Sequence, residues 1–105
     1  MFYKEGQIMD QPVSTKELRD EIEEIDGQII DLIATRVDIT DELAKAKKRS
    51  GQSYWDEAKG REIVERYLDL CTEVSLTEEE AEQIAHVILS ISKERQKKIY
   101  DNGKS

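Results

Sequence analysis

Two cations interrupt an apolar helical stripe in the first half of the chain. Arg36 stands between Leu32 and Ile39 at the spacing of one helix face, where an apolar side chain is expected. Lys47 follows eleven residues later. A helix turns by about 100° per residue, so eleven residues bring Lys47 to within about 20° of the direction of Arg36. Both cations therefore lie on one helix face, roughly 16 Å apart along the axis. Because burial of an unpaired charge is costly, we expect an anion close to this pair.

A second polar pair interrupts the last apolar stripe of the chain. Ser92 and Gln96 are four residues apart, so a hydroxyl and an amide share one helix face. Together with Arg36 and Lys47 they predict a pocket for a small anion, and a carboxylate fits best because a guanidinium grips it bidentately. The structural alternative is that Arg36 pairs with an internal acidic residue, while Lys47 extends its ammonium group to water.

Arg19 could serve such a pocket only from another chain. It precedes Arg36 by seventeen residues, which is about 25 Å along the same helix and about 100° around it. The two guanidinium groups therefore cannot grip one small molecule within one chain. The alternative for Arg19 is a solvated position in the first turns, among acidic neighbours.

The chain offers little for nucleophilic or metal-assisted catalysis. Its single cysteine, Cys71, excludes an intramolecular disulfide, and its single histidine is His86. Neither stands in a zinc-binding or Cys/His catalytic pattern, and both lie at helical spacing from apolar residues. We therefore expect packing or surface positions for both, and no metal or other cofactor.

Length and composition describe one acidic, helical domain. The 105 residues are too few for a second core. The composition, with 38% charged and 6% aromatic residues, favours helices over strands. A formal net charge of −8 argues against nucleic acid and anionic membrane as partners. No apolar run could span a membrane and the N-terminus is too polar for a signal peptide, so we expect a cytoplasmic protein. We assign an N-terminal extension to residues 1–13, the helical domain to 14–101 and a tail to 102–105.

The first predicted helix is too long for one chain to cover. It begins after Ser14, which forms a capping box with Glu17, and it ends in "KRSGQS", where Gly51 suits a C-cap. Its apolar positions follow four- and three-residue spacing: Leu18, Ile22, Ile25, Ile29, Leu32, Ile39 and Leu43. About 35 residues give roughly 52 Å, whereas a compact chain of this size has a radius of gyration of about 13 Å. We therefore expect a second copy, most simply in a two-fold dimer, to cover the stripe.

Two shorter helices are predicted after the loop "SGQSYW". One starts at Asp56 as N-cap and runs to about Thr72, with Ile63, Tyr67 and Leu70 facing inward. The last starts after Thr77, which caps the amide of Glu80, and runs to about Tyr100. Its inner face carries Ala81, Ile84, Ala85, Ile88, Ile91, Ser92 and Ile99. No strand pattern stands out. The predicted fold class is therefore all-α, a three-helix chain with one long N-terminal helix.

These motifs together resemble the small all-helical class of chorismate mutases. The resemblance rests on "LRDEIEEIDGQIIDLIATR", "KAK", "WDEAKGRE" and "SISKERQ", and it runs without gaps over residues 18–100. Each motif alone is weak. The combined spacing of Arg19, Arg36, Lys47 and Gln96 is fairly specific.

The resemblance implies an intertwined homodimer with two equivalent active sites that rearrange chorismate to prephenate, at the branch to phenylalanine and tyrosine. Arg36 and the partner chain's Arg19 would hold the two carboxylates of this dianionic substrate, with Ser92 assisting. Lys47 and Gln96 would hydrogen-bond the ether oxygen. A pericyclic rearrangement needs no nucleophile, base or metal, so the protein acts by selecting a conformer and stabilising developing charge.

One segment departs from the family pattern. The resemblance places Asp56 where its backbone amide meets the ring hydroxyl of the substrate. The family usually has Arg-Glu in the next turn, but the alignment puts Lys59 and Gly60 there, and the pair Arg61 and Glu62 follows two residues later. Two residues rotate a side chain by about 200°, so Arg61 and Glu62 can take these roles only if the preceding loop is remodelled. Lys59 keeps a positive charge, and Gly60 offers no carboxylate.

Two other functions stay open beside a chorismate mutase, which is an isomerase. An isochorismate pyruvate lyase shares the fold and the Arg, Arg, Lys and Gln set, and the missing Glu at position 60 keeps it in view. A non-catalytic helical dimerisation module should have an apolar interior, against which the four inward polar residues argue. We expect no fused dehydratase, dehydrogenase or regulatory domain in a chain of this length.

Overall fold

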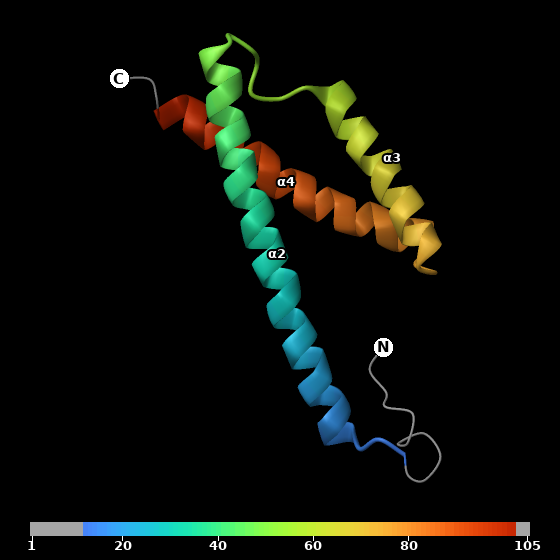
Figure 1. The fold of residues 1–105 in the computed structure, drawn as a ribbon. Coiled ribbons are helices and arrows are strands. Elements are labelled where there is room, and N and C mark those ends of the chain that lie inside the picture. Colours follow the sequence, from blue (N-terminus) through green and yellow to red (C-terminus); the bar gives the residue numbers. More distant parts are fainter. Residues whose placement is uncertain (1–11, 103–105) are drawn as a thin grey trace. The chain divides into compact units, whose positions relative to one another are not determined.

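The computed structural model describes residues 12–102. This range contains three helices and no strand, in the order α2 (Thr15–Arg49), α3 (Glu57–Glu73) and α4 (Glu78–Asn102), as Figure 1 shows. The predicted all-α fold class is confirmed. Residues 1–11 of the predicted N-terminal extension and residues 103–105 of the predicted tail lie outside the described residues, and the domain bounds stay a prediction. No helix of the described range is long and apolar enough to cross a membrane.

The helices begin at the capping residues that the sequence predicts. The Glu17 amide donates to the Ser14 hydroxyl at 3.1 Å. The Asp56 carboxylate accepts two amides of the first turn of α3, at 2.9 and 3.4 Å. At α4, the Glu80 amide donates to the Thr77 hydroxyl at 3.0 Å, and the Thr77 amide donates to the Glu80 carboxylate at 2.8 Å. These caps satisfy backbone donors that the first turn leaves unpaired, and they fix where each helix starts.

α2 ends as its sequence predicts, and this end sets the direction of the next loop. Gly51 has a φ of 76°, in the left-handed region that glycine adopts without strain. The Gln52 amide then donates back to the Lys47 carbonyl at 2.9 Å. The loop from residue 50 to 56 is thus tied back to the backbone of Lys47, one of the predicted site residues.

The described chain divides after Ala34 into two compact units. The N-terminal unit holds residues 15–34 of α2, and much of its predicted apolar stripe is exposed. Ile22 is 56% exposed, Ile29 47% and Leu32 71%. A continuous apolar stripe exposed to this extent is typical of a surface that binds another protein.

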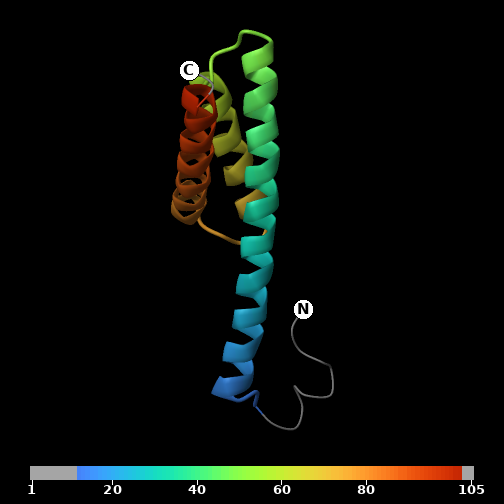
Figure 2. The same cartoon turned by 90° about the vertical axis from the view of Figure 1, so that its left-hand side faces the viewer.

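The second unit holds the remainder of α2 together with α3 and α4. α3 and α4 pack against each other and run in opposite directions (Figures 1 and 2). Small side chains form most of the buried apolar core: Ala44, Ala81, Ala85, Cys71 and Ile88. Of the positions predicted to face inward, Ala81, Ala85 and Ile88 are buried. Leu70, Ile84 and Ile91 are instead 54%, 42% and 37% exposed in the single chain.

Candidate active site

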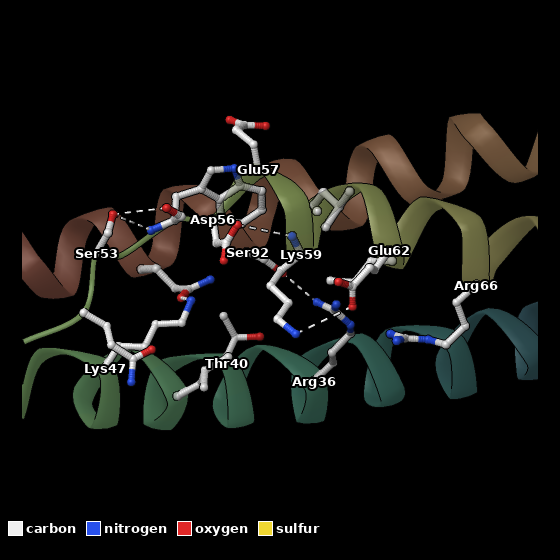
Figure 3. Close-up of a pocket in the computed structure, with 17 residues that line it drawn as sticks. Arg36, Thr40, Lys47, Ser53, Asp56, Glu57, Lys59, Glu62, Arg66 and Ser92 are labelled. Carbon is white, nitrogen blue, oxygen red and sulfur yellow. Dashed lines mark hydrogen bonds and ion pairs between the residues drawn. The ribbon is translucent and has the colours of Figure 1, made fainter. Parts of the chain in front are cut away.

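The second unit contains a pocket of about 900 Å³ lined by all three of its helical segments. Six of the seven predicted site residues line it: Arg36, Lys47, Asp56, Lys59, Ser92 and Gln96. Figure 3 shows α2 along one side of the pocket, with α3 and α4 opposite. Residues that lie up to 60 positions apart in the sequence, Arg36 and Gln96, are therefore brought to one cavity by the packing of the helices.

Lys47 is held in place by neutral oxygen atoms. Its Nζ donates to Oε1 of Gln96 at 2.8 Å and to the backbone carbonyl of Tyr54 at 3.3 Å. Gln96 is only 3% exposed, so its amide is fixed within the α4 side of the pocket. An ammonium group has three N–H donors. One donor of Lys47 therefore stays available to a ligand.

The charge of Lys47 is weakly compensated. Partial burial lowers the pKa of Lys47 from the ordinary lysine value, because it disfavours the charged form, and the nearby Asp56 carboxylate offsets part of this effect. No carboxylate of the described residues lies within ion-pair distance of Lys47. Its ammonium is thus positioned in the pocket, partly desolvated and available to an anion.

Arg36 is held in a similar way. Its Nη1 donates to Oγ of Ser92 at 2.6 Å, and Ser92 is buried on α4. Among residues 12–102, Arg36 forms no ion pair, so the alternative of an internal acidic partner is wrong. A guanidinium has five N–H donors, and Ser92 takes one. The remaining donors can bind a carboxylate of a ligand.

The loop that carries Asp56 is fastened to the end of α4. The Tyr100 hydroxyl donates to the backbone carbonyl of Gln52, and the rings of Tyr54 and Tyr100 lie 5.7 Å apart. The Asp56 carboxylate caps the N-terminus of α3. The backbone amide of Asp56 donates to no atom of the described residues. The sequence indicates Tyr100 only as the end of a helix, because a hydrogen bond across 48 positions leaves no local signal.

The segment that departs from the family pattern contributes three residues to the pocket. Lys59, Gly60 and Glu62 line it, whereas Arg61 does not. Glu62 follows Lys59 by three residues, which puts these two on one helix face. The Lys59 ammonium and the Glu62 carboxylate lie 3.7 Å apart (Figure 3).

Gly60 is buried beneath the indole of Trp55. A Cβ atom added at position 60 would lie 3.3 Å from Cζ2 of Trp55, closer than ordinary van der Waals contact. The indole also has a cation as neighbour, because the Lys93 Nζ lies 5.4 Å from the ring centroid. The Trp55 indole N–H is buried and has no hydrogen-bond partner among the described residues. The indole thus occupies the space that a longer side chain at position 60 would need.

Arg66 is a pocket residue that sequence analysis missed. It lies on α3, seven residues after Lys59, and it lines the pocket together with Ile63. Positions i, i+4 and i+7 share one helix face, so this periodicity was the available signal. Arg19, the seventh predicted site residue, belongs to the N-terminal unit, where it is exposed and forms no ion pair with any described residue.

The fold is all-α, and the pocket is lined by four cations together with the carboxylates of Asp56, Glu57 and Glu62. The family model for chorismate mutase type II matches residues 18–97, and the chain belongs to this family. We found no significant match among curated proteins or among solved structures.

Proposed function

We propose that the protein is a chorismate mutase, an isomerase that converts chorismate to prephenate for phenylalanine and tyrosine biosynthesis. The observation that carries this proposal is the pair of Arg36 and Lys47. Both cations line one pocket without a carboxylate partner, and both are held by neutral groups of α4. In a member of this family, a dianionic substrate is the ligand that would complete such a site.

The reaction places its main electrostatic demand on the ether oxygen. The carbon–oxygen bond breaks as a carbon–carbon bond forms, no proton moves, and negative charge grows on the oxygen. The free N–H of Lys47 and the amide nitrogen of Gln96 would donate to that oxygen. Donors that are already fixed stabilise developing charge without reorganisation. The bond of 2.8 Å between Lys47 and Gln96 supports this assignment because it fixes both side chains before substrate enters.

The carboxylates and the ring hydroxyl of the substrate would use other groups. Arg36, oriented by Ser92, would bind one carboxylate. The backbone amide of Asp56 would meet the ring hydroxyl, and its lack of a protein acceptor supports this role. Lys59 is exposed at the pocket and pairs only with Glu62, at 3.7 Å, so it would add positive charge at the same end.

Arg19 of the partner subunit would bind the second carboxylate in an intertwined homodimer. The exposed apolar stripe of the N-terminal unit supports dimerisation, because a second copy would bury Ile22, Ile29 and Leu32. Within one chain, seventeen residues of helix separate Arg19 from Arg36.

Mixing two inactive variants tests this sharing. Arg19→Ala and Arg36→Ala homodimers should each be nearly inactive, whereas exchanged heterodimers should recover one working pocket in each dimer. Subunit exchange is followed by mass spectrometry of isotopically labelled chains. Complete exchange without recovered turnover would contradict a site shared between chains.

An isochorismate pyruvate lyase is the second candidate. The observation that favours it is Gly60, which brings no carboxylate to the pocket and lies under Trp55. Incubation of the pure protein with chorismate and with isochorismate, followed by NMR, separates the two. We expect prephenate from chorismate. Release of pyruvate from isochorismate, without prephenate formation, would favour the lyase, and no turnover of either substrate would contradict both enzymes and leave the dimerisation module.

A further inference from the structure

α3 directs a second guanidinium group at the pocket. Arg66 lines the pocket and forms no hydrogen bond or ion pair with any described residue. Figure 3 shows its side chain extending from α3 towards α2, at the end of the pocket where Arg36 lies and away from Lys47. Two helices thus contribute one guanidinium each, and neither guanidinium is neutralised by a carboxylate.

Among the described residues Arg66 lacks an ion pair, although acidic residues stand near it in the sequence. Glu62 lies four residues before Arg66, the order and spacing that favour an ion pair on a helix surface. Glu62 instead lies 3.7 Å from the Lys59 ammonium, and Asp69, three residues after Arg66, is not within 4.0 Å of it either. Arg66 therefore has two acidic neighbours at suitable positions and yet extends towards the pocket.

We propose that Arg66 binds the second carboxylate of the substrate, jointly with Arg19 of the partner subunit. This inference rests on the proposed function. It adds a second arginine that binds a substrate carboxylate from the same chain as Arg36. A carboxylate offers about four acceptor positions on two oxygens, enough for two guanidinium groups. Arg36 binds the first carboxylate, and Arg66 fixes the orientation of the dianion at the end of the pocket farthest from Lys47.

Steady-state kinetics of Arg66→Gln with chorismate test the role. A charge-assisted hydrogen bond is lost in the ground state and in the transition state alike, so KM should rise about 10- to 100-fold while kcat changes less than about threefold. Arg66→Lys keeps the charge without the planar fork and should recover part of the loss. Arg61→Gln is the matched control, because Arg61 is an exposed arginine of α3 that does not line the pocket. It should leave KM unchanged.

Binding of two simple aromatic acids tests the same role without turnover. Isophthalate carries two carboxylates and benzoate carries one. NMR titration of the wild-type protein should show tighter binding of isophthalate. Arg66→Gln should lose most of this preference, by about tenfold or more, and should bind benzoate with little change.

The two experiments separate failure of this inference from failure of the proposed function. An unchanged KM and an unchanged preference for isophthalate in Arg66→Gln would overturn the inference. A raised KM with the preference intact and a weaker dimer in sedimentation would also overturn it, since Arg66 would then act on assembly. If wild-type protein turned over neither substrate, but Arg66→Gln still lost the preference, the dianion site would stand and the proposed reaction would fail.

Discussion

The two sides of the pocket are built differently. On the α4 side, Ser92 and Gln96 are 5% and 3% exposed, and each accepts one short hydrogen bond from a cation of α2. On the α3 side, Lys59, Glu62 and Arg66 are exposed charges. Their one mutual contact is the ion pair of 3.7 Å between Lys59 and Glu62.

This difference separates positioning from recognition. The buried acceptors Ser92 and Gln96 keep Arg36 and Lys47 in one geometry, and fixed donors act well where charge develops, so the α4 side suits the chemical step. Exposed ionic side chains keep rotamer freedom and are ordered only when a ligand arrives, at a cost in entropy. The α3 side suits selection among anionic substrates. Substitutions on the α4 side should therefore lower kcat, and substitutions on the α3 side should raise KM.

The largest effect is expected from Lys47→Ala. It removes the one cation that the Gln96 amide fixes in the pocket, so kcat should fall on the order of 10²- to 10³-fold. Lys45→Ala is the matched control, since Lys45 is exposed on the same helix and pairs with Glu42 at 3.2 Å. The measurement is the initial rate of prephenate formation, with circular dichroism to verify helicity. Activity near wild type in Lys47→Ala would contradict the assignment of Lys47 to the ether oxygen.

The sequence predicted well which residues of α2 and α4 meet at the pocket. Arg36, Lys47, Ser92 and Gln96 stand in otherwise apolar stripes, and such irregularities are visible without a structure. Capping residues likewise fixed the starts of all three described helices, because a cap is a contact over two or three positions.

The α3 side was predicted less well because its residues obey ordinary surface patterns. Arg66 among exposed charges resembles any solvated arginine, and only the packing of α3 opposite α2 gives it a ligand-binding position. The burial of Gly60 depends on where the loop places Trp55, which no local pattern encodes. The exposure of Leu70 shows a further limit of prediction from the sequence. Helical spacing shows that a helix face is apolar, but it does not show which element covers that face.

An effect of intermediate size on the pH dependence of activity is expected from Asp56→Asn. Asp56, at the start of α3, acts on the charge of Lys47. Activity should fall at alkaline pH as Lys47 loses its proton, and the lowered pKa of Lys47 puts this fall below the ordinary lysine range. The Asp56 charge raises that pKa, so its removal should lower the pKa further and move the alkaline limb to lower pH. Asparagine still caps the helix, so stability should change little.

The pH profile of kcat/KM measures this shift. Glu57→Gln is the matched control, because it removes the next carboxylate along the chain, which pairs with Lys93 at 3.5 Å. Its alkaline limb should stay in place. A limb that moves to higher pH in Asp56→Asn, or that moves equally in both variants, would show that Asp56 does not set the protonation of Lys47.

The smallest effect is expected from Gly60→Ala, which fills the one place where the α3 side is tightly packed. Alanine favours the helix by about 1 kcal/mol over glycine, but its Cβ would lie 3.3 Å from the Trp55 indole and must displace the ring by a few tenths of an ångström. The two effects oppose each other, so the free energy of unfolding should rise by less than about 1 kcal/mol. Trp55 is the single tryptophan of the chain, so its emission reports the displacement directly.

Gly27→Ala separates the two contributions. Gly27 lies within α2, and nothing lies within 4 Å of a Cβ added there, so the substitution should give the full gain of about 1 kcal/mol with unchanged tryptophan emission. Chemical denaturation followed by circular dichroism measures both variants. An equal gain in Gly60→Ala, together with a shifted tryptophan emission, would show that the indole moves without cost. The α3 side would then be adjustable throughout, and the contrast with the fixed Lys47–Gln96 pair would extend to its only buried position.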